Sequence, residues 1–161
     1  MAVVNWGELR VERPDLADAG EALLYQYGVG LAFLATVRAD GGPRVHPMCP
    51  ILHEGELYAL LVPSPKRRDL LRDGRFSLHS FPVENNEDAF SVSGRARLVT
   101  NAETRTAVVV RFMEERPNLP LTKSTLDDQL LFTFDIATCL LTRTQGHGDP
   151  KPEHVVWRSN P

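Results

Sequence analysis

The chain has 161 residues, of which 42% are hydrophobic and 24% charged, and its formal net charge is −3. This composition indicates one soluble globular domain spanning residues 1–161, with enough chain to bury a core. The slightly negative charge argues against a surface that attracts nucleic acid or an anionic membrane, so we expect neither as a partner.

Cysteine usage and the N-terminus both favour the cytoplasm. Cys49 and Cys139 show no CxxC spacing, which is typical of free thiols in a reducing compartment. The N-terminus has no basic segment followed by an apolar one, so no signal peptide is predicted. The apolar stretch Gly28–Val37 is far too short to span a bilayer.

The first predicted elements are a helix and a strand pair. Apolar residues on one face predict a helix over Pro14–Tyr27, and Leu31–Arg38 is typical of a strand. A turn then leads into a second expected strand, Arg44–Leu52. Pro47 and Pro50 interrupt it, and because proline cannot donate to a ladder, this strand is expected to be an edge, bulged, or facing something other than a strand.

A short basic helix is the most unusual feature of the chain. A third strand ending at Val62 precedes it; Ser64 is suited to its N-cap, Pro65 to its first position and Gly74 to its C′ position. Its first turn contains three cations, Lys66, Arg67 and Arg68. Each is unfavourable there by about 0.3–1 kcal/mol unless an anion compensates it. The turn therefore predicts either a phosphate site or a solvated basic face that Asp69 and Asp73 neutralise.

The second half of the chain continues in strands. The further expected elements are strands at Arg75–Phe81, Phe90–Leu98 (with a bulge at Gly94), Gln129–Thr142 and His154–Arg158, and a helix from a Thr100/Glu103 capping box to Arg116. Six or seven mostly antiparallel strands and three helices predict a mainly β fold, a closed or partly closed β-barrel carrying α-helices.

A catalytic set made of side chains is not evident. GxSxG, HExxH and P-loop motifs are absent, and the histidines are scattered, so a His147–His154 metal pair is less favoured than surface histidines and no metal is predicted. Asp127 and Asp128 are adjacent and would point to opposite faces of a strand. A phosphate site without a catalytic team indicates a bound phosphorylated cofactor that carries the chemistry.

The order of these elements resembles the pyridoxamine 5'-phosphate oxidase-like superfamily, the FMN-binding split barrels and their deazaflavin-using relatives. Four stretches carry the resemblance: Leu31–Met48, Ser64–Arg75, Val92–Ala96 and His154–Arg158. The resemblance implies a split barrel that is usually a homodimer, with two cofactor sites at the subunit interface.

The resemblance also assigns roles. It implies that Ser64, Lys66 and Arg67 hold the cofactor phosphate. It implies that His46, Pro47 and Met48 lie along the isoalloxazine ring, with main-chain groups at its polar edge, and that Trp157 and Arg158 reach the site of the partner subunit. Plain packing of Trp157 is an equal alternative, and Arg44 is as well explained by solvation as by a cofactor role. Many relatives carry Asn in place of Asp69, whose charge weakens the positive field.

These features predict an FMN-dependent oxidoreductase acting on an unknown small substrate. One alternative is the deazaflavin coenzyme F-420, whose acidic tail would suit Arg68 and Arg72. Another is a non-catalytic flavin- or haem-binding protein, with His79 or His147 as the axial ligand.

Overall fold

A computed structural model describes residues 2–160. The helices are α1 (Trp6–Glu12), α2 (Pro14–Leu24), α3 (Pro65–Arg72), α4 (Ala102–Glu114) and the short 3-10 helix η1 (Ser124–Leu126). The strands are β1 (Ala32–Val37), β2 (Pro43–Met48), β3 (Ile51–His53), β4 (Glu56–Leu61), β5 (Arg75–Ser80), β6 (Ala89–Leu98), β7 (Leu130–Arg143) and β8 (Glu153–Arg158). None of the helices in this part of the chain is long and apolar enough to cross a membrane.

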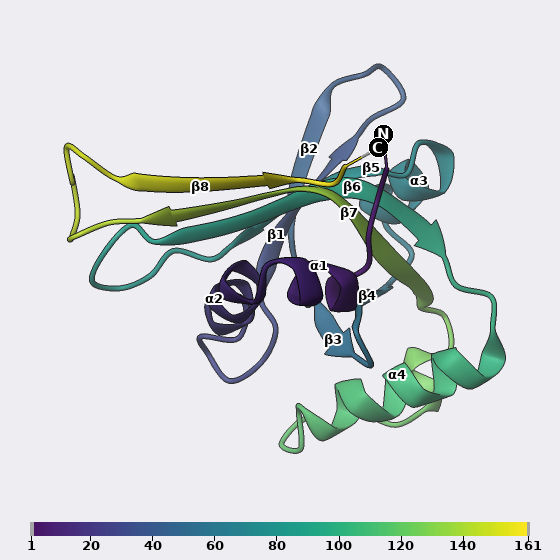
Figure 1. Cartoon of the computed structure of the whole chain (residues 1–161). Coiled ribbons are helices and arrows are strands. Elements are labelled where there is room, and N and C mark those ends of the chain that lie inside the picture. Colours follow the sequence, from purple (N-terminus) through teal and green to yellow (C-terminus); the bar gives the residue numbers. More distant parts are fainter. Residues whose placement is uncertain (1, 161) are drawn as a thin grey trace.

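The eight strands form one antiparallel sheet that curls into a partly closed barrel (Figure 1). The strand order is β2-β1-β5-β6-β7-β4-β3, and β8 pairs with the C-terminal half of β7, beyond the point where β4 ends. Strands β2 and β3 are the two ends of this order. The expected mainly β fold of split-barrel type is confirmed.

Helices α1 and α2 cover one face of the sheet, and the main hydrophobic core lies between them and the strands (Figure 1). Its fully buried side chains include Leu9, Leu16, Leu34, Phe90 and Phe134. A second, smaller core lies where α4 packs on β3, and it consists of Ile51, Tyr58, Val108 and Leu131. The outward-facing residues of β5 are exposed, so α1 and α2 leave the opposite face of this part of the sheet uncovered.

The N-terminal helix differs from the expected range of 14–27. It ends at Leu24. The N–H of the C-cap residue Tyr25 donates to the Glu21 carbonyl oxygen, and the chain then turns back into β1. A separate helix, α1, precedes it and was not predicted. Its signal is present in the sequence, since Asn5 and Glu8 form a capping box in which each side chain accepts the other residue's N–H at 2.8 Å.

The expected strand over residues 44–52 is two strands. β2 pairs with β1, whereas β3 pairs with β4 at the other end of the sheet. The chain passes between them at Cys49-Pro50, where Gly30 lies so close that a Cβ there would be 1.9 Å from the Pro50 carbonyl oxygen. Pro50 therefore marks a crossing between the two ends of the sheet, whereas Pro47 lies within β2, which is an edge strand, one of the expected alternatives.

The expected cap of α4 and the expected numbers of elements are wrong. Asn101, not Thr100, caps α4 by accepting the Thr104 N–H at 2.8 Å, and the helix ends at Glu114. The described residues contain eight strands and four α-helices, one or two strands and one helix more than expected. The bulge at Gly94 is confirmed by the register shift between Ser93 and Gly94.

Tyr25 connects three elements, and we expect Tyr25→Phe to destabilise the protein by about 1–2 kcal/mol. Its hydroxyl accepts the Leu52 N–H at 2.9 Å and lies 3.1 Å from Glu115 Oε1, to which it donates. Burial raises the pKa of Tyr25 to about 12, so the hydroxyl keeps the proton that it donates. Tyr27→Phe is the matched control, because that hydroxyl only donates to the Pro82 carbonyl at the exposed surface.

Thermal unfolding measures both tyrosine variants. Loss of the Tyr25 hydroxyl is expected to lower the Tm by roughly 5 °C, and loss of the Tyr27 hydroxyl by much less. Equal shifts in the two variants would show that Tyr25 does not hold α4 to the rest of the domain.

Candidate anion and cofactor site

Helix α3 begins as its sequence predicts. Ser64 has extended backbone angles, and its hydroxyl accepts the Arg67 N–H at 3.4 Å. Pro65 occupies the first helical position, and Gly74 follows the last turn with a φ of 75°, which an L side chain rarely adopts. No acidic residue lies in the first turn. The Arg67 and Arg68 N–H groups are bonded to Ser64, so the helix start offers the Lys66 N–H and its cations to an anion.

Asp69 is the buried centre of this region, with 4% of its surface exposed. Its carboxylate accepts from Thr36 Oγ1 at 2.9 Å, Arg44 Nε at 2.7 Å and Arg72 Nη1 at 3.3 Å. Burial by itself raises the pKa of Asp69, but the hydrogen bonds from Arg44 and Thr36 outweigh burial, so the pKa lies below 3.8. Asp69 therefore fastens α3 to β1 and β2 and fixes the position of Arg44 beside the helix.

Lys66 points toward β2. Its Nζ donates to the Pro47 carbonyl oxygen at 2.9 Å, and two of its three ammonium donors remain for another acceptor. Burial lowers the pKa of Lys66 below its ordinary value of 10.5. The contact joins the start of α3 to the strand that the resemblance places along a flavin ring.

Arg67 points in another direction. Its Nη1 donates to the Asp128 carbonyl oxygen at 2.7 Å and to the Leu61 carbonyl oxygen at 3.4 Å, next to the start of β7. Ser64, Lys66 and Arg67 are therefore neighbours in the helix, but the side chains of Lys66 and Arg67 do not converge. Arg44, whose role the sequence left open, lies on β2, the strand that Lys66 contacts, and its side chain is bonded to Asp69 of α3.

The three residues on β2 alternate between the two faces of the sheet. In the register with β1, His46 is opposite Leu34 and Met48 opposite Ala32, whereas Pro47 is opposite Phe33 on the other face. Met48 is buried in the core, His46 is half-buried and Pro47 is exposed. A ligand along this strand would therefore meet the side chains of His46 or Pro47, and Met48 only through its main chain.

The two C-terminal residues also differ from each other. Trp157 is buried against α1, where its indole N–H donates to Glu12 Oε2 at 3.0 Å. Arg158 is exposed and lies opposite Thr138 on the sheet face that α1 and α2 leave uncovered. That these residues reach the site of a partner subunit stays a prediction.

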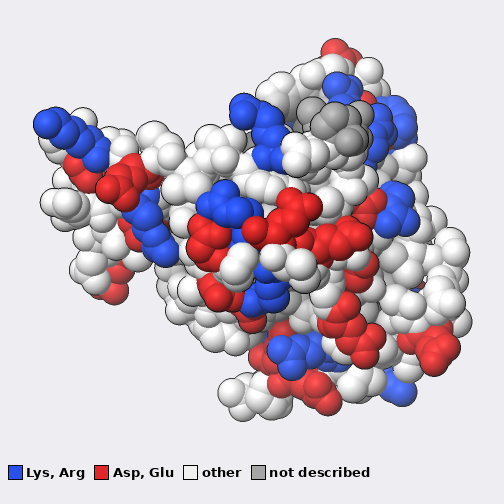
Figure 2. Space-filling view, viewed as in Figure 1, with Lys and Arg blue, Asp and Glu red and all other residues white. Residues whose placement is uncertain are grey.

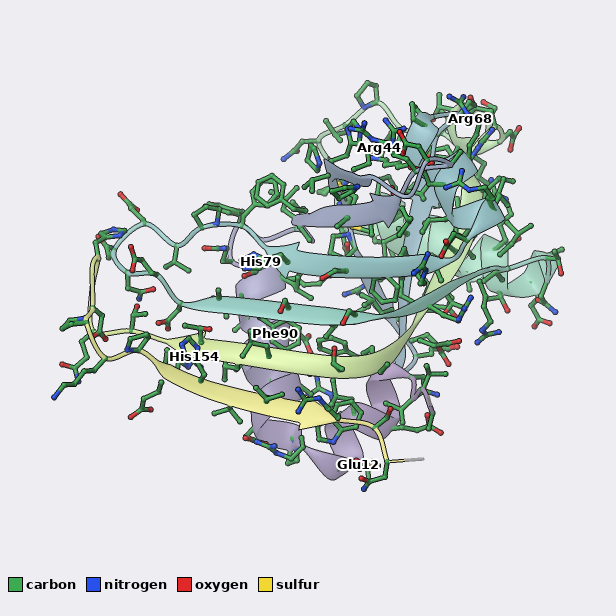
Figure 3. All side chains as sticks on the ribbon, turned by 90° about the horizontal axis from the view of Figure 1, so that it is seen from above. Glu12, Arg44, Arg68, His79, Phe90 and His154 are labelled. Carbon is green, nitrogen blue, oxygen red and sulfur yellow. The ribbon has the colours of Figure 1, made fainter. Side chains whose placement is uncertain are left out.

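The charges around α3 leave a local excess of cations. Lys66, Arg67, Arg68 and Arg72 lie on the helix, with Arg44 beside it, and Asp69 is the buried acid among them. Basic side chains gather where Figure 1 places α3, whereas acidic and basic groups mix over the rest of that face (Figure 2). Arg44 and Arg68 lie at the same end of the sheet (Figure 3). Within residues 2–160, no group of three or more His, Cys, Asp or Glu is placed to hold a metal ion.

Solved structures with the same fold cover most of this chain. A haem-binding protein from Mycobacterium smegmatis matches with a TM-score of 0.63 and 17% identity over 85% of this chain, which spans 57% of that protein. A putative pyridoxamine 5'-phosphate oxidase from Listeria innocua matches with a TM-score of 0.60 and 17% identity over 77% of this chain and 95% of its own. An F420 reductase matches with a TM-score of 0.56 and 20% identity, over 74% and 94%. At these identities the likeness shows the fold alone.

The sequence comparisons are more specific. The search of curated proteins finds no match. The sequence model of the pyridoxamine 5'-phosphate oxidase family matches residues 24–142, from the end of α2 to the end of β7. The match covers well over half of the chain. It includes β2, α3, and Asp69 with its three partners Thr36, Arg44 and Arg72. The chain therefore belongs to the pyridoxamine 5'-phosphate oxidase-like split-barrel superfamily.

Proposed function

We propose that this protein is an FMN-dependent oxidoreductase acting on a small substrate. The observation that carries the proposal is the 2.9 Å contact between Lys66 Nζ and the Pro47 carbonyl. It places the cationic start of α3 directly beside β2. A cofactor with its phosphate at α3 and its ring along β2 needs this arrangement.

The donor set of the chain suits a phosphate ester. The Lys66 main-chain N–H, the Lys66 ammonium and the Arg44 guanidinium are anion donors on adjacent elements. Asp69 engages Arg44 only through Nε, so the other guanidinium nitrogens remain for a phosphate oxygen. When bound, a flavin would supply hydride transfer, and the residues of the chain would bind and orient it.

Coenzyme F-420 is a weaker candidate for the same site. Its acidic tail would require cations beyond those that hold one phosphate, and the sequence offers Arg68 and Arg72. The Arg72 guanidinium, however, donates to Asp69 and to the Val37 carbonyl, which leaves Arg68 as the one of the two that is not engaged by another described residue. This difference favours FMN.

Haem is the third candidate, and its proposed axial ligands, His79 and His147, do line one cavity. The charged residues that line this cavity are Glu87 and Asp88, with no lysine or arginine among the lining residues. Haem propionates are anionic and need cationic or donor partners. The cavity therefore favours haem less than the α3 site favours FMN.

Cofactor titration tests the proposal. We expect the purified protein to bind FMN with quenching of flavin fluorescence, and to bind riboflavin, which lacks the phosphate, at least tenfold more weakly. Tighter binding of F-420, or a Soret band on addition of haem with no uptake of FMN, would overturn it. If FMN binds but the bound flavin is neither reduced by any tested reductant nor reoxidised by any tested acceptor, the result would instead indicate storage.

The predicted homodimer with shared cofactor sites remains part of the proposal. The exposed Arg158 and the uncovered face of β8 support it, because they leave a cation free for a second copy. Sedimentation of the FMN-loaded protein at twice the monomer mass of 18.0 kDa is the expected result.

A further inference from the structure

A cavity of ≈ 470 Å³ opens on the sheet face opposite α1 and α2, at the end away from α3. His79 marks its position on β5, and Figure 3 shows it well separated from Arg44 and Arg68. Its lining comes from β1, β5, the loop between β5 and β6, the first residue of β6, and the loop between β7 and β8. The residues that the argument uses are Phe33, His79, Phe81, Val83, Glu87 and His147. The volume lies within the range of small-molecule sites.

One wall of the cavity is flat and apolar. The rings of Phe33 and Phe81 stack with centroids 4.4 Å apart and planes 24° apart, and Val83 and Ala89 extend the surface. Both phenylalanines are half-buried, so part of each ring remains open to the cavity. A planar aromatic ligand matches such a wall in shape and can stack on it.

The two histidines present acceptors. His79 Nδ1 lies 2.7 Å from the Ser80 carbonyl oxygen and must donate to it, so in the neutral ring Nε2 keeps a lone pair. His147 Nε2 likewise donates to the Glu84 carbonyl at 3.0 Å, which leaves Nδ1 as the acceptor. A ligand that satisfies these nitrogens must bring its own N–H or O–H groups.

The acidic groups decide which charge the ligand can have. Glu87 is about half exposed and its Oε1 lies 3.9 Å from His147 Nδ1. Asp88 is already bonded to Arg143 and Thr144. Since Glu87 and Asp88 line the cavity and no lysine or arginine does, an anionic ligand would meet repulsion there that no lining cation compensates. This separates the cavity from the phosphate end of the proposed cofactor.

We propose that this cavity is a binding site for a neutral or cationic planar aromatic compound that carries an N–H or O–H donor, with Phe33 and Phe81 as the stacking wall and His79 as the acceptor. The binding itself needs no flavin. Phe33 is opposite Pro47 across β1 and β2, so the cavity adjoins the strand proposed for the flavin ring. That the compound is the substrate rests on the proposed function.

Three small probes test the site at pH 8 by proton NMR of the histidine and phenylalanine resonances. Indole is planar, neutral and carries an N–H, benzofuran has the same shape without the donor, and indole-3-carboxylate adds a negative charge. We expect indole to saturate one site, benzofuran to bind about tenfold more weakly, and the carboxylate to bind more weakly than indole by at least tenfold.

Substitution of His79 distinguishes a hydrogen bond to its ring from non-specific binding to the apolar wall. His79→Phe is expected to bring indole down to the affinity of benzofuran while leaving benzofuran unchanged, because the substitution keeps an aromatic ring and removes the acceptor that the proposal assigns to indole. His154→Phe is the matched control, since His154, on β8, bonds Thr142 of β7 and does not line the cavity. It should leave all three affinities unchanged.

Equal binding of indole and benzofuran, no saturable shift with indole, or a difference that survives His79→Phe would each overturn the inference. So would a Soret band that His79→Phe abolishes, because the cavity would then hold haem. The titrations are run with and without FMN. Indole binding without FMN binding refutes only the proposed function, and FMN binding without indole binding refutes only this inference.

Discussion

Lys66→Met is expected to weaken FMN binding by about tenfold to a hundredfold and to leave riboflavin binding unchanged. Methionine keeps most of the length of the side chain and removes the ammonium. Hydrogen bonds to charged groups contribute about 1.5–3 kcal/mol, and Lys66 would make one with the phosphate from a position already fixed by the Pro47 carbonyl. Fluorescence titration with the two flavins measures the difference.

Two variants serve as comparisons for Lys66. Lys151→Met removes a lysine from the exposed loop between β7 and β8 and should change neither affinity. Arg67→Met removes a neighbouring cation whose Nη1 is bonded to the Asp128 and Leu61 carbonyls. We expect Arg67→Met to lower the Tm more than Lys66→Met does, and to weaken FMN binding less than Lys66→Met does. If Lys66→Met weakens the binding of riboflavin and of FMN by the same factor, Lys66 does not contact the phosphate.

The pH dependence of FMN binding should also depend on the charge of Lys66. Burial lowers the pKa of Lys66, so this ammonium loses its proton at a lower pH than an exposed lysine, whose value is 10.5. FMN affinity is therefore expected to fall as the pH rises through this lowered pKa. Lys66→Met should lack that alkaline limb, and a profile identical to the wild type would contradict the assignment.

Asp69→Ala is expected to reduce the free energy of unfolding by about 3 kcal/mol, the largest stability effect that we predict. The substitution leaves the Arg44 and Arg72 guanidinium groups and the Thr36 hydroxyl without their shared acceptor. The side chains of Arg44 and Arg72 are 25% and 41% exposed, so water recovers part of the loss and the estimate stays at the low end for a buried ion pair. The Tm should fall by roughly 10 °C.

Asp73→Ala provides the matched comparison at the C-cap of the same helix. Asp73 bonds Arg75 at the surface, so its removal should change the Tm far less. Asp69→Asn keeps the shape and should lie between the two, because it retains an acceptor but loses the charge. If Asp69→Ala and Asp73→Ala unfold at the same temperature, Asp69 is not the group that fastens α3 to β1 and β2.

Acid unfolding tests the charge on Asp69 directly. Because its pKa is lower in the folded protein than the ordinary 3.8, the carboxylate adds stability above pH 3.8. That contribution is lost as the pH falls below 3.8 and through the lower folded pKa. Asp69→Asn should remove this part of the dependence, so the two stability curves converge in acid. Curves that stay parallel would show that the folded protein does not perturb Asp69.

Short-range signals predicted helix α3 almost completely. Ser64, Pro65 and Gly74 act within the helix and its two ends, and each has the role that its position indicates. The bulge at Gly94 was predictable for the same reason. Where a local signal was overlooked, as in the Asn5–Glu8 capping box of α1, the residues were still sufficient to find it.

The sequence by itself therefore determined a mainly β, closed or partly closed barrel, with a helix that starts in cations, because capping and alternation act between residues a few positions apart. Only the tertiary structure decided that Asp69 binds Arg44, that Lys66 and Arg67 diverge toward β2 and β7, and that His79 and His147 line one cavity. These contacts join residues from 19 to 68 positions apart. Their geometry depends on how the sheet curls and which strands pair, which no local pattern specifies.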